Sequence, residues 1–384
     1  MTRRLKILHL TASLSVGGGE RMILELAKHT NKTQFETYVC AVGQFHDQTL
    51  ITEFQELGSI FHIIPNRDFY NLARLQAIAA YIREKEIDLI QTHLIDADIM
   101  GAIIGKWLRI PVITTLQNDH QNYQRQRRDR HILARIMGRY AATHLVAVSE
   151  QIRRSFIKEW RIPADRISTI HNSIHLNRFL PIAPGTPVGT PLTITNIASL
   201  SPQKAQDLLL EAAKIVLTEM PDVSFMIVGR GRLEQILKEK AHALGIADHI
   251  QFTGLRHDIP DILARSDIFV LSSLWEGLPV SGVEAMAAAR AVVLTDVGGN
   301  RELIPTEQHG RIVPPNDVPA LAHALLQLLR DEPTRIAMGQ VARAHVEQTF
   351  SIKTCIEQYE TLYLTIWQQY YGHILPAIAS GEAT

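Results

Sequence analysis

Two glutamates stand eight residues apart in the segment Glu276–Glu284, which reads Glu-Gly-Leu-Pro-Val-Ser-Gly-Val-Glu. The apolar run 267–272 before it predicts a buried strand, and the alanine-rich run 283–289 predicts a helix. The turn would then lie at the carboxyl end of a strand, where open α/β sheets bind ligands. Two carboxylates at such a turn could exchange protons with a substrate or accept hydrogen bonds from its hydroxyl groups.

The residues between the glutamates suit an anionic ligand. Gly277 has no Cβ, and Pro279 suits the first position of a helix. The N–H groups that follow have no partner within the helix, so they would sit beside a phosphate with the helix dipole behind them. Glu284 would accept from a diol such as a ribose, and Glu276 from a second sugar. The alternative is one solvated acid and one acid at the start of a helix.

A glycine-rich turn follows the first predicted strand of each half of the chain, at 17–20 and 229–232. Glycines allow positive φ and let backbone N–H groups approach a phosphate or a sugar. Met22 and Glu234 occupy the place of the third glycine, so neither turn is a dinucleotide fingerprint, and the sequence has no P-loop. We expect a ligand at each turn.

Strand and helix patterns alternate along the whole chain, which predicts an α/β fold with parallel sheets. In the first half the expected strands are 5–11, 37–42, 88–92, 112–116 and 144–148, and the expected helices are 21–28, 72–84, 99–108 and 132–140. In the second half the expected strands are 192–197, 223–228, 250–253, 268–271 and 291–294.

A proline- and glycine-rich stretch interrupts this alternation and predicts a linker. An aromatic-rich helix over 351–371 is expected to pack back across the domain junction. The predicted organisation is two doubly wound domains, 1–180 and 192–350, with the linker at 181–191 and the terminal helix within 351–384.

Composition predicts a cytoplasmic protein. Cys40 and Cys355 are the only cysteines, which argues against a disulfide framework. The amino terminus enters a strand pattern without a signal-peptide cleavage site, and no apolar run approaches the roughly 18 residues that span a bilayer. The formal net charge is zero, and we expect no nucleic-acid partner. Residues 1–180 carry 24 Lys and Arg against 17 Asp and Glu, so the two halves are expected to face different partners.

The segment 276–287 resembles the glutamate-x7-glutamate motif of retaining glycosyltransferases of the GT-B fold, most closely family 4 (group 1). The resemblance extends over nearly the whole chain. It implies two doubly wound, Rossmann-like domains facing across a cleft, the first on the acceptor side and the second binding the donor. The supporting segments are 17–20, 91–93, 147–150, 170–173, 201–204, 227–231, 252–254 and 295–299.

The resemblance also assigns roles to matching residues. Lys204 matches the lysine that binds the donor diphosphate, Glu284 the residue on the nucleotide ribose, and Glu276 the residue near the transferred sugar. His93 matches a histidine that reaches toward that sugar. The implied catalytic set is therefore His93, Lys204 and Glu276. The implied donor-binding set adds Gly18, Gly19, Gly229, Arg230, Gly277, Leu278, Pro279 and Glu284.

Several positions depart from the family pattern. Ser199 stands where an arginine is common, so Arg230 or Arg232 would have to supply that charge. Asn172-Ser173 replaces asparagine-glycine, Ala289-Arg-Ala291 replaces glycine-x-proline, and Gln117 replaces a frequent histidine. The acceptor-side candidates are Asn118, His120, Arg125 and Arg128.

The resemblance implies transfer with retention of anomeric configuration, without a metal and without a tightly bound cofactor. The co-substrate would be a UDP or GDP sugar, and the acceptor a glycan, a lipid-linked sugar or a small molecule, as in polysaccharide or lipopolysaccharide biosynthesis. The two glutamates would then hold hydroxyl groups rather than form a glycosidase-type acid/base pair. A sugar-nucleotide epimerase, a phosphorylase or a catalytically silent sugar-nucleotide-binding protein stays an alternative, although no pyridoxal lysine segment is found.

Residues 123–140 contain six arginines and interleaved apolar residues, which predicts a basic amphipathic helix. Three interpretations stay open for it: contact with an anionic membrane at the inner face, binding of a phosphorylated acceptor, or a solvated helix.

Overall fold

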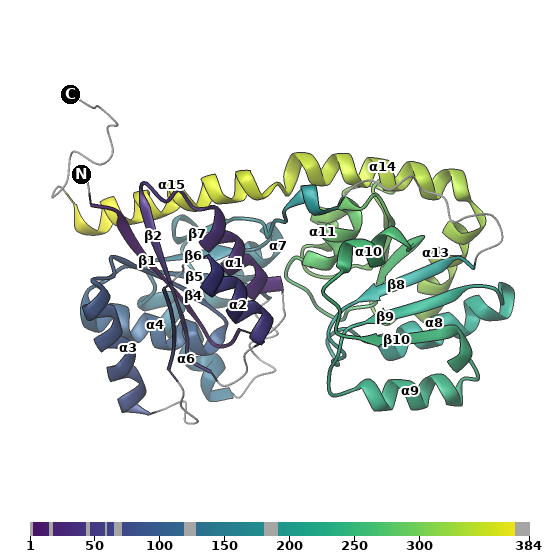
Figure 1. The fold of residues 1–384 in the computed structure, drawn as a ribbon, viewed down its shortest axis with the longest axis horizontal. Helices are drawn as coiled ribbons and strands as arrows, with labels where there is room; N and C mark the ends of the chain where they lie inside the picture. The colour runs from purple at the N-terminus through teal and green to yellow at the C-terminus, as the bar shows by residue number, and fades with distance from the viewer. Residues whose placement is uncertain are drawn as a thin grey trace. The chain divides into compact units, whose positions relative to one another are not determined.

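The computed structural model describes residues 3–14, 18–43, 47–57, 60–64, 71–118, 128–179 and 191–372. The chain divides into two compact units. Unit 1 comprises Met1–Asn172 and Ile352–Thr384, and unit 2 comprises Ser173–Ser351. The expected linker 181–191 lies outside the described residues except for Pro191. The chain therefore leaves unit 1 once and returns to it with its last helix (Figure 1).

Unit 1 contains a parallel sheet of seven strands in the order β3-β2-β1-β4-β5-β6-β7. In its register Thr11 of β1 lies opposite His93 of β4, and His93 lies opposite Thr115 of β5. The order reverses between β1 and β4, which makes the carboxyl ends of these strands the expected ligand side. The strands are β1 (Leu5–Thr11), β2 (Phe35–Ala41), β3 (Ile60–Ile63), β4 (Leu89–His93), β5 (Val112–Leu116), β6 (His144–Ala147) and β7 (Ile167–Thr169).

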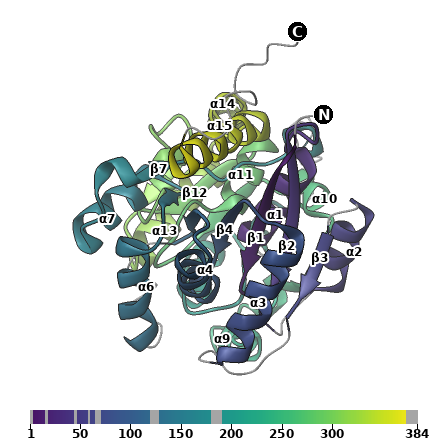
Figure 2. The same ribbon diagram turned by 90° about the vertical axis from the view of Figure 1, so that its left-hand side faces the viewer.

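Helices cover both faces of this sheet (Figure 2). Buried residues of α1 and α15 pack with Ile7 and Ile113 on one face, and α3 and α4 pack with Leu10 and Ile90 on the other. Because α15 buries a stripe along one side, its polar surface stays outside. The helices are α1 (Gly18–His29), α2 (Gln48–Glu56), α3 (Leu72–Lys85), α4 (Ile95–Leu108), α6 (Arg128–Tyr140), α7 (Glu150–Trp160) and α15 (Ile352–Tyr371), with the short 3₁₀ helix η1 (Ala164–Arg166).

Unit 2 contains a parallel sheet of six strands in the order β10-β9-β8-β11-β12-β13. The order reverses between β8 and β11, so the loops after these two strands meet at the ligand side of the sheet. The strands are β8 (Thr193–Ile197), β9 (Ser224–Val228), β10 (Ile250–Gly254), β11 (Ile268–Leu271), β12 (Ala291–Thr295) and β13 (Arg311–Val313).

The main core of unit 2 lies where α8 and α13 pack against the sheet. Helix α13 buries Leu321, Leu325 and Leu328, which recur at helical spacing. Helices α11 and α14 pack on each other and on β12. The helices are α8 (Gln206–Glu219), α9 (Glu234–Ala243), α10 (Ile259–Ala264), α11 (Val280–Ala287), α12 (Asn300–Leu303), α13 (Val318–Arg330) and α14 (Glu332–Thr349), with the 3₁₀ helices η2 (Leu176–Arg178) and η3 (Ala247–His249).

The two sheets confirm the predicted α/β class and parallel strands, and they contain strands that the sequence pattern did not indicate. These are β3, β7 and β13, each at an edge of its sheet and only three or four residues long. Such short strands carry too little periodicity to be recognised before their neighbours are placed. In the described residues, no helix is long and apolar enough to cross a membrane.

Candidate functional site

In unit 2, Lys204 and Glu276 form an ion pair. The distance from Lys204 Nζ to Glu276 Oε1 is 2.5 Å. Ser273 Oγ donates to the same carboxylate oxygen over 2.7 Å, and Glu276 is only 4% exposed. Two predicted site residues that are 72 positions apart in sequence are thereby brought together at the point where the strand order reverses.

Hydrogen bonds between the loops after β8 and β11 hold this pair in place. Ser272 Oγ donates to the carbonyl oxygens of Lys204 and Ala205, each over 2.9 Å. The backbone N–H of Leu274 donates to the carbonyl of Gln203 over 2.8 Å. The position of Lys204 is thus fixed by hydrogen bonds to its backbone as well as by its ion pair with Glu276.

The loop after β12 closes on the backbone of Glu276. Gly298 has a φ of +51°, and a Cβ there would lie 2.1 Å from the Glu276 carbonyl oxygen. The N–H of Gly299 donates to the Gly277 carbonyl over 2.7 Å. Glycine is therefore required at position 298 both by φ and by the close approach of the chain.

Helix α11 starts directly after the loop that follows β11 and contains Glu276. Pro279 is its N-cap and not its first helical residue, because the proline has an extended ψ of 112°. It gives the helix no side-chain cap, so the first backbone N–H groups are left for another acceptor. Gly277, Leu278 and Pro279 are buried, and Glu284, one turn into the helix, is half-buried.

The loop after β9 lies beside the loop after β8. The N–H of Leu200 donates to the Arg230 carbonyl over 3.1 Å, which places Arg230 next to Ser199. Gly229 has a φ of +140°, and a Cβ there would lie 2.0 Å from the Ala198 carbonyl oxygen. Arg230 and Arg232 are both exposed at this end of the sheet. Arg230 is thus adjacent to the position that lacks the usual arginine.

In unit 1, His93 ends strand β4 and forms a buried pair with His9 of β1. The distance from His9 Nδ1 to His93 Nε2 is 3.2 Å. Burial lowers the pKa of His9 to about 3, with a further contribution from Lys32, and burial and His9 lower the pKa of His93 well below its ordinary value. Both imidazoles are therefore neutral at pH 7, and among the described residues the buried His93 Nδ1 has no hydrogen-bond partner.

The residue after His93 has a strained backbone. Leu94 has a φ of +71° and a ψ of 148°, a region that is essentially restricted to glycine. It is the N-cap of α4 and gives that helix no side-chain hydrogen bond. Strain of this kind costs about 1–3 kcal/mol and is concentrated at functional sites.

Gly18 and Gly19 form the first turn of α1, as predicted for a glycine-rich turn that opens a helix. A Cβ on Gly19 would lie 3.4 Å from Gln117 Cδ, so the turn packs against this side chain. Asn172 Nδ2 donates to Gln117 Oε1 over 3.0 Å. Gln117 is half-buried directly after β5, and its buried Nε2 has no hydrogen-bond partner within the part of the chain that the structure describes.

The acceptor-side candidates are only partly covered by the structure. Asn118 is half-buried directly after Gln117. His120 and Arg125 lie outside the described residues, and Arg128 is the first residue of α6. Helix α6 exposes Ile132, Ile136 and Tyr140.

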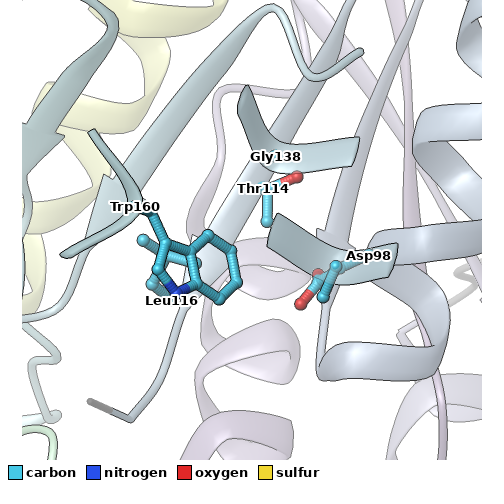
Figure 3. Close-up of a pocket in the computed structure, with 6 residues that line it drawn as sticks. Asp98, Thr114, Leu116, Gly138 and Trp160 are labelled. Carbon is cyan, nitrogen blue, oxygen red and sulfur yellow. The ribbon is translucent and has the colours of Figure 1, made fainter. Parts of the chain in front are cut away.

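A small pocket near α6 contains none of the predicted site residues (Figure 3). It is lined by Asp98 of α4, Thr114 and Leu116 of β5, Trp160 of α7, and Ala134 and Gly138 of α6. Side chains alternate along a strand, so Thr114 and Leu116 face away from Thr115, the neighbour of His93. The pocket therefore lies on the opposite face of the sheet from His93.

Sequence reasoning missed Ser273 and His9, and it named Gly298 only within the segment 295–299, without a role. Ser273 could have been found as a hydroxyl three residues before a site carboxylate. His9 carried no such signal, because one histidine in an apolar strand gives no indication of its partner. Within the described residues, no three His, Cys, Asp or Glu side chains are grouped so that they could hold a metal ion.

Comparisons with known proteins agree with this arrangement. The model of the glycosyltransferase family 4 group matches residues 16–178, and that of glycosyl transferases group 1 matches residues 183–345. The chain is 26% identical over 308 residues to the Escherichia coli UDP-Gal:alpha-D-GlcNAc-diphosphoundecaprenol alpha-1,3-galactosyltransferase, covering 77% of this chain and 79% of the relative. It is also 26% identical to the Bacillus anthracis N-acetyl-alpha-D-glucosaminyl L-malate synthase, covering 93% of this chain and 96% of the relative.

Among solved structures, the fold resembles that of Anabaena HepE in complex with UDP-glucose. The TM-score is 0.83 at 23% identity, over 94% of this chain and 100% of the other. The sucrose-phosphate synthase of Thermosynechococcus elongatus gives a TM-score of 0.76 at 18% identity, over 95% of this chain and 100% of the other. These likenesses confirm the expected GT-B fold. With the two family models matched in sequence over both halves, the chain belongs to the family 4, group 1 glycosyltransferases.

Proposed function

We propose that this glycosyltransferase moves a hexose from a nucleoside-diphosphate sugar to a hydroxyl group of its acceptor, with retention of the anomeric configuration. The observation that carries the proposal is the ion pair between half-buried Lys204 and buried Glu276 at the reversal of strand order in unit 2. A lysine beside an uncapped helix N-terminus provides the positive potential that a diphosphate needs. Unit 2 is therefore assigned the donor and unit 1 the acceptor side.

Each part of the donor sugar nucleotide has a complementary residue in unit 2. Lys204 and the first N–H groups of α11 would hold the diphosphate, and Arg230 would supply the charge that Ser199 lacks. Glu284 would accept from the ribose, and Glu276 from the hexose. The Escherichia coli relative is named for UDP-galactose and a lipid diphosphate acceptor. We propose the same classes here: a UDP or GDP sugar, and a glycan, lipid-linked or small acceptor.

The proposed reaction needs no protein nucleophile. The acceptor oxygen bonds to the anomeric carbon as the bond from that carbon to the donor phosphate oxygen breaks on the same face. The acceptor proton passes to a phosphate oxygen of the leaving diphosphate. Catalysis would rest on positioning and on stabilising the developing phosphate charge, for which Lys204 and the α11 N-terminus are placed. We propose that this requires no metal.

The test is release of nucleoside diphosphate from a panel of UDP and GDP sugars, with and without candidate acceptors. The Lys204→Ala variant should lose about 10²- to 10³-fold in turnover, the scale for removing a donor to a developing charge. Lys240→Ala is the matched control, since Lys240 Nζ also lies 2.5 Å from a carboxylate, that of Glu211, in another part of unit 2. Near-normal transfer by Lys204→Ala would contradict the proposal.

Binding without turnover would favour the silent sugar-nucleotide-binding protein. An altered sugar in the recovered nucleotide, without transfer, would favour the epimerase. The anomeric proton coupling of the isolated product reports retention directly, and activity after treatment with a chelator reports whether a metal is needed.

We also propose that α6 contacts an anionic membrane surface, which would place the protein at the inner face of the cytoplasmic membrane. Ile132, Ile136 and Tyr140 recur every four residues and are 57%, 43% and 65% exposed. Arg135 is exposed between them. An apolar stripe with basic neighbours suits a helix lying in the interface of anionic lipid.

Flotation with phosphatidylglycerol vesicles tests this contact, with phosphatidylcholine vesicles for comparison. Binding should be stronger to the anionic vesicles and should weaken as salt is raised. An Ile132→Ser, Ile136→Ser double variant should bind less, whereas Ile236→Ser, at an exposed isoleucine of α9, should not. Equal flotation of both variants would exclude α6 as the contact.

A further inference from the structure

The carboxyl end of α11 is closed by the turn 289–291, where the sequence departs from the family pattern. Ala289 has a φ of +57°, in the left-handed region. Its N–H and that of Arg290 donate to carbonyl oxygens of the preceding turn, each over 3.0 Å. These two hydrogen bonds form a Schellman motif, which leaves the carbonyl oxygens of Ala287 and Ala288 for other donors.

Two arginine side chains supply those donors. Arg343 Nη1, from α14, donates to the carbonyl oxygen of Ala287, and Arg290 Nε donates to that of Ala288 over 2.9 Å. Arg290 is buried, and its Nη1 also donates over 3.0 Å to the carbonyl of Ser266, in the segment before β11. The last carbonyls of α11 are therefore held by two guanidinium groups, which stay protonated in proteins. We call Arg290 and Arg343 the arginine clamp.

Helix α14 lies against α11 and places Arg343 at this turn (Figure 1). A Cβ on Gly339 would lie 2.1 Å from the Ala289 carbonyl oxygen, so α14 and the turn are in backbone contact. Arg343 follows Gly339 by four residues and lies on the same face of α14. Its Nη1 also donates to the Phe179 carbonyl over 2.5 Å. Arg343 thus joins three segments of unit 2 that are distant in sequence.

The two ends of α11 therefore differ. The arginine clamp compensates the partial negative charge of the carboxyl end, whereas the amino end, after Pro279, has no side-chain cap. Eight residues span about 12 Å, so the positive potential of the clamp reaches the amino end.

Two carboxylates lie near the arginine clamp. Burial lowers the pKa of Arg290, and Asp267 opposes this effect and favours the charged form. Glu347 accepts from Arg343 Nε over 2.8 Å, but its side chain is exposed, so water screens its charge more than that of half-buried Arg343. The clamp therefore keeps a positive potential along the helix.

We infer that Arg290 and Arg343 are positioning residues of the donor site: by holding the carboxyl end of α11, they fix the direction of the helix and favour an anion at its amino end. The inference rests on the proposed function, in which that end binds the donor diphosphate. Neither arginine would touch the donor. Their effect would appear in the affinity for the phosphates and would depend on a positive charge at position 343.

Calorimetric titration with UDP and with GDP tests the inference. Arg343→Met, which keeps an unbranched side chain and removes its charge and its donors, should weaken binding of the nucleoside diphosphate about fivefold. Arg343→Lys should recover most of this affinity, because an ammonium group keeps the charge and can still donate to the Ala287 carbonyl. Unchanged affinity in Arg343→Met, or an Arg343→Lys variant as weak as Arg343→Met, would overturn the inference.

Arg335 provides the matched control, because it makes the same kind of contact at a different helix. It is a buried residue of α14, and its Nη1 donates to the Leu328 carbonyl over 2.8 Å, at the carboxyl end of α13. Arg335→Met should lower the Tm about as much as Arg343→Met and leave the affinity for nucleoside diphosphate unchanged. Equal weakening of nucleoside diphosphate in both variants would show a general loss of packing at α14 and would overturn the inference.

A surface variant tests the charge without disturbing the buried contacts, and it serves also if Arg343→Met does not fold. Glu347→Gln removes the negative charge beside Arg343. It should strengthen binding of UDP or GDP about twofold, on the scale of an exposed ion pair. Unchanged or weaker binding would contradict an effect of the charge at position 343.

The proposed function and this inference fail in different ways. Wild type that binds no nucleoside diphosphate and transfers no sugar would refute the proposed function, and the inference with it. Wild type that binds and transfers, together with folded Arg343 variants of unchanged diphosphate affinity, would refute the inference alone.

Discussion

Lys204 and Glu276 form an ion pair in which their charges compensate each other. A donor diphosphate must therefore compete with the Glu276 carboxylate for the lysine ammonium group. The carboxylate also places a negative charge close to the proposed position of the phosphates. Glu276 would thus weaken diphosphate binding while it holds the sugar, and the two effects can be measured separately.

Glu276→Gln should separate them. The glutamine amide oxygen can still accept from Ser273, but the negative charge is lost. We expect affinity for free UDP or GDP to rise about fivefold, roughly 1 kcal/mol, and turnover with the nucleotide sugar to fall at least about tenfold. Calorimetric titration and diphosphate release measure the two quantities. Glu211→Gln is the control, and unchanged diphosphate affinity in Glu276→Gln would argue against a shared lysine.

The strained backbone at Leu94 predicts how substitutions at this position change the stability of the protein. Because its φ and ψ lie in a region that suits glycine, Leu94→Gly should be more stable than Leu94→Ala by about 1–3 kcal/mol. At an ordinary position of a folded chain, alanine would be the more stable of the two. Denaturant unfolding of both variants gives the difference. A less stable glycine variant would show that the backbone here is not strained.

At the scale of elements, α15 completes the core of unit 1. Its buried residues Cys355, Tyr359, Tyr363 and Ile366 follow one side of the helix. They pack with Phe35, Leu89 and other apolar residues of the sheet. Tyr363 also donates to Gln91 Oε1, while Gln91 Nε2 donates to Thr115 Oγ1 over 2.9 Å. The helix thus supports the strands that end in the site residues of this unit.

Tyr363→Phe tests this support. The substitution keeps the ring in the core and removes the hydroxyl that donates to the buried Gln91 oxygen. We expect the free energy of unfolding to fall by about 1–3 kcal/mol, which is the cost of leaving a buried polar atom without its hydrogen-bond partner. Tyr370→Phe is the control, since Tyr370 is 41% exposed on the same helix. Equal stability of both variants would contradict a structural role of the hydroxyl.

At the scale of the whole molecule, the histidines with lowered pKa are concentrated in unit 1. Among the described residues they are His9, His93 and His144, and burial is the main cause for each. The pKa of His144 is lowered to about 4, with Arg166 as a further cause. In the unfolded chain such histidines bind protons near pH 6.5. Between pH 6.5 and the lowered pKa of each histidine, the folded unit 1 therefore binds fewer protons than the unfolded chain.

Unit 1 should lose stability as the pH falls below 6.5. Because the unfolded state binds more protons in this range, the stability of unit 1 is full above pH 6.5 and falls as the pH is lowered. His9 and His144 should each contribute a loss of up to about 2 kcal/mol at pH 5. Burial raises the pKa of Asp88 and Asp96, which opposes part of this loss between the raised folded pKa of each carboxyl and the unfolded value near 4.

Scanning calorimetry at a series of pH values from 7.5 to 5 should show that unit 1 begins to lose stability at a higher pH than unit 2. His144→Asn should reduce the dependence, and His242→Asn, at an exposed histidine of unit 2, should not. A single transition that shifts equally in both variants would show that the two units do not differ in this respect.

The sequence by itself determined the α/β class, the parallel sheets and the turn that carries Glu276, because buried parallel strands give continuous apolar runs and helices repeat every 3.6 residues. It also located His93 at a strand end and Lys204 in the segment that follows a predicted strand, through motifs whose order along the chain is specific. The short edge strands could not be predicted from the sequence, since three or four residues carry too little periodicity.

Only the tertiary structure decided which atoms meet. The Lys204–Glu276 pair joins loops that are separated by three strands in sequence but follow adjacent strands in the sheet. The contact of His9 with His93 likewise depends on β1 and β4 being neighbours in the sheet, and the contact of Asn172 with Gln117 joins the segments that follow β7 and β5. Periodicity is a local property, whereas side-chain partners are fixed by how distant segments pack, and no local pattern contains that information.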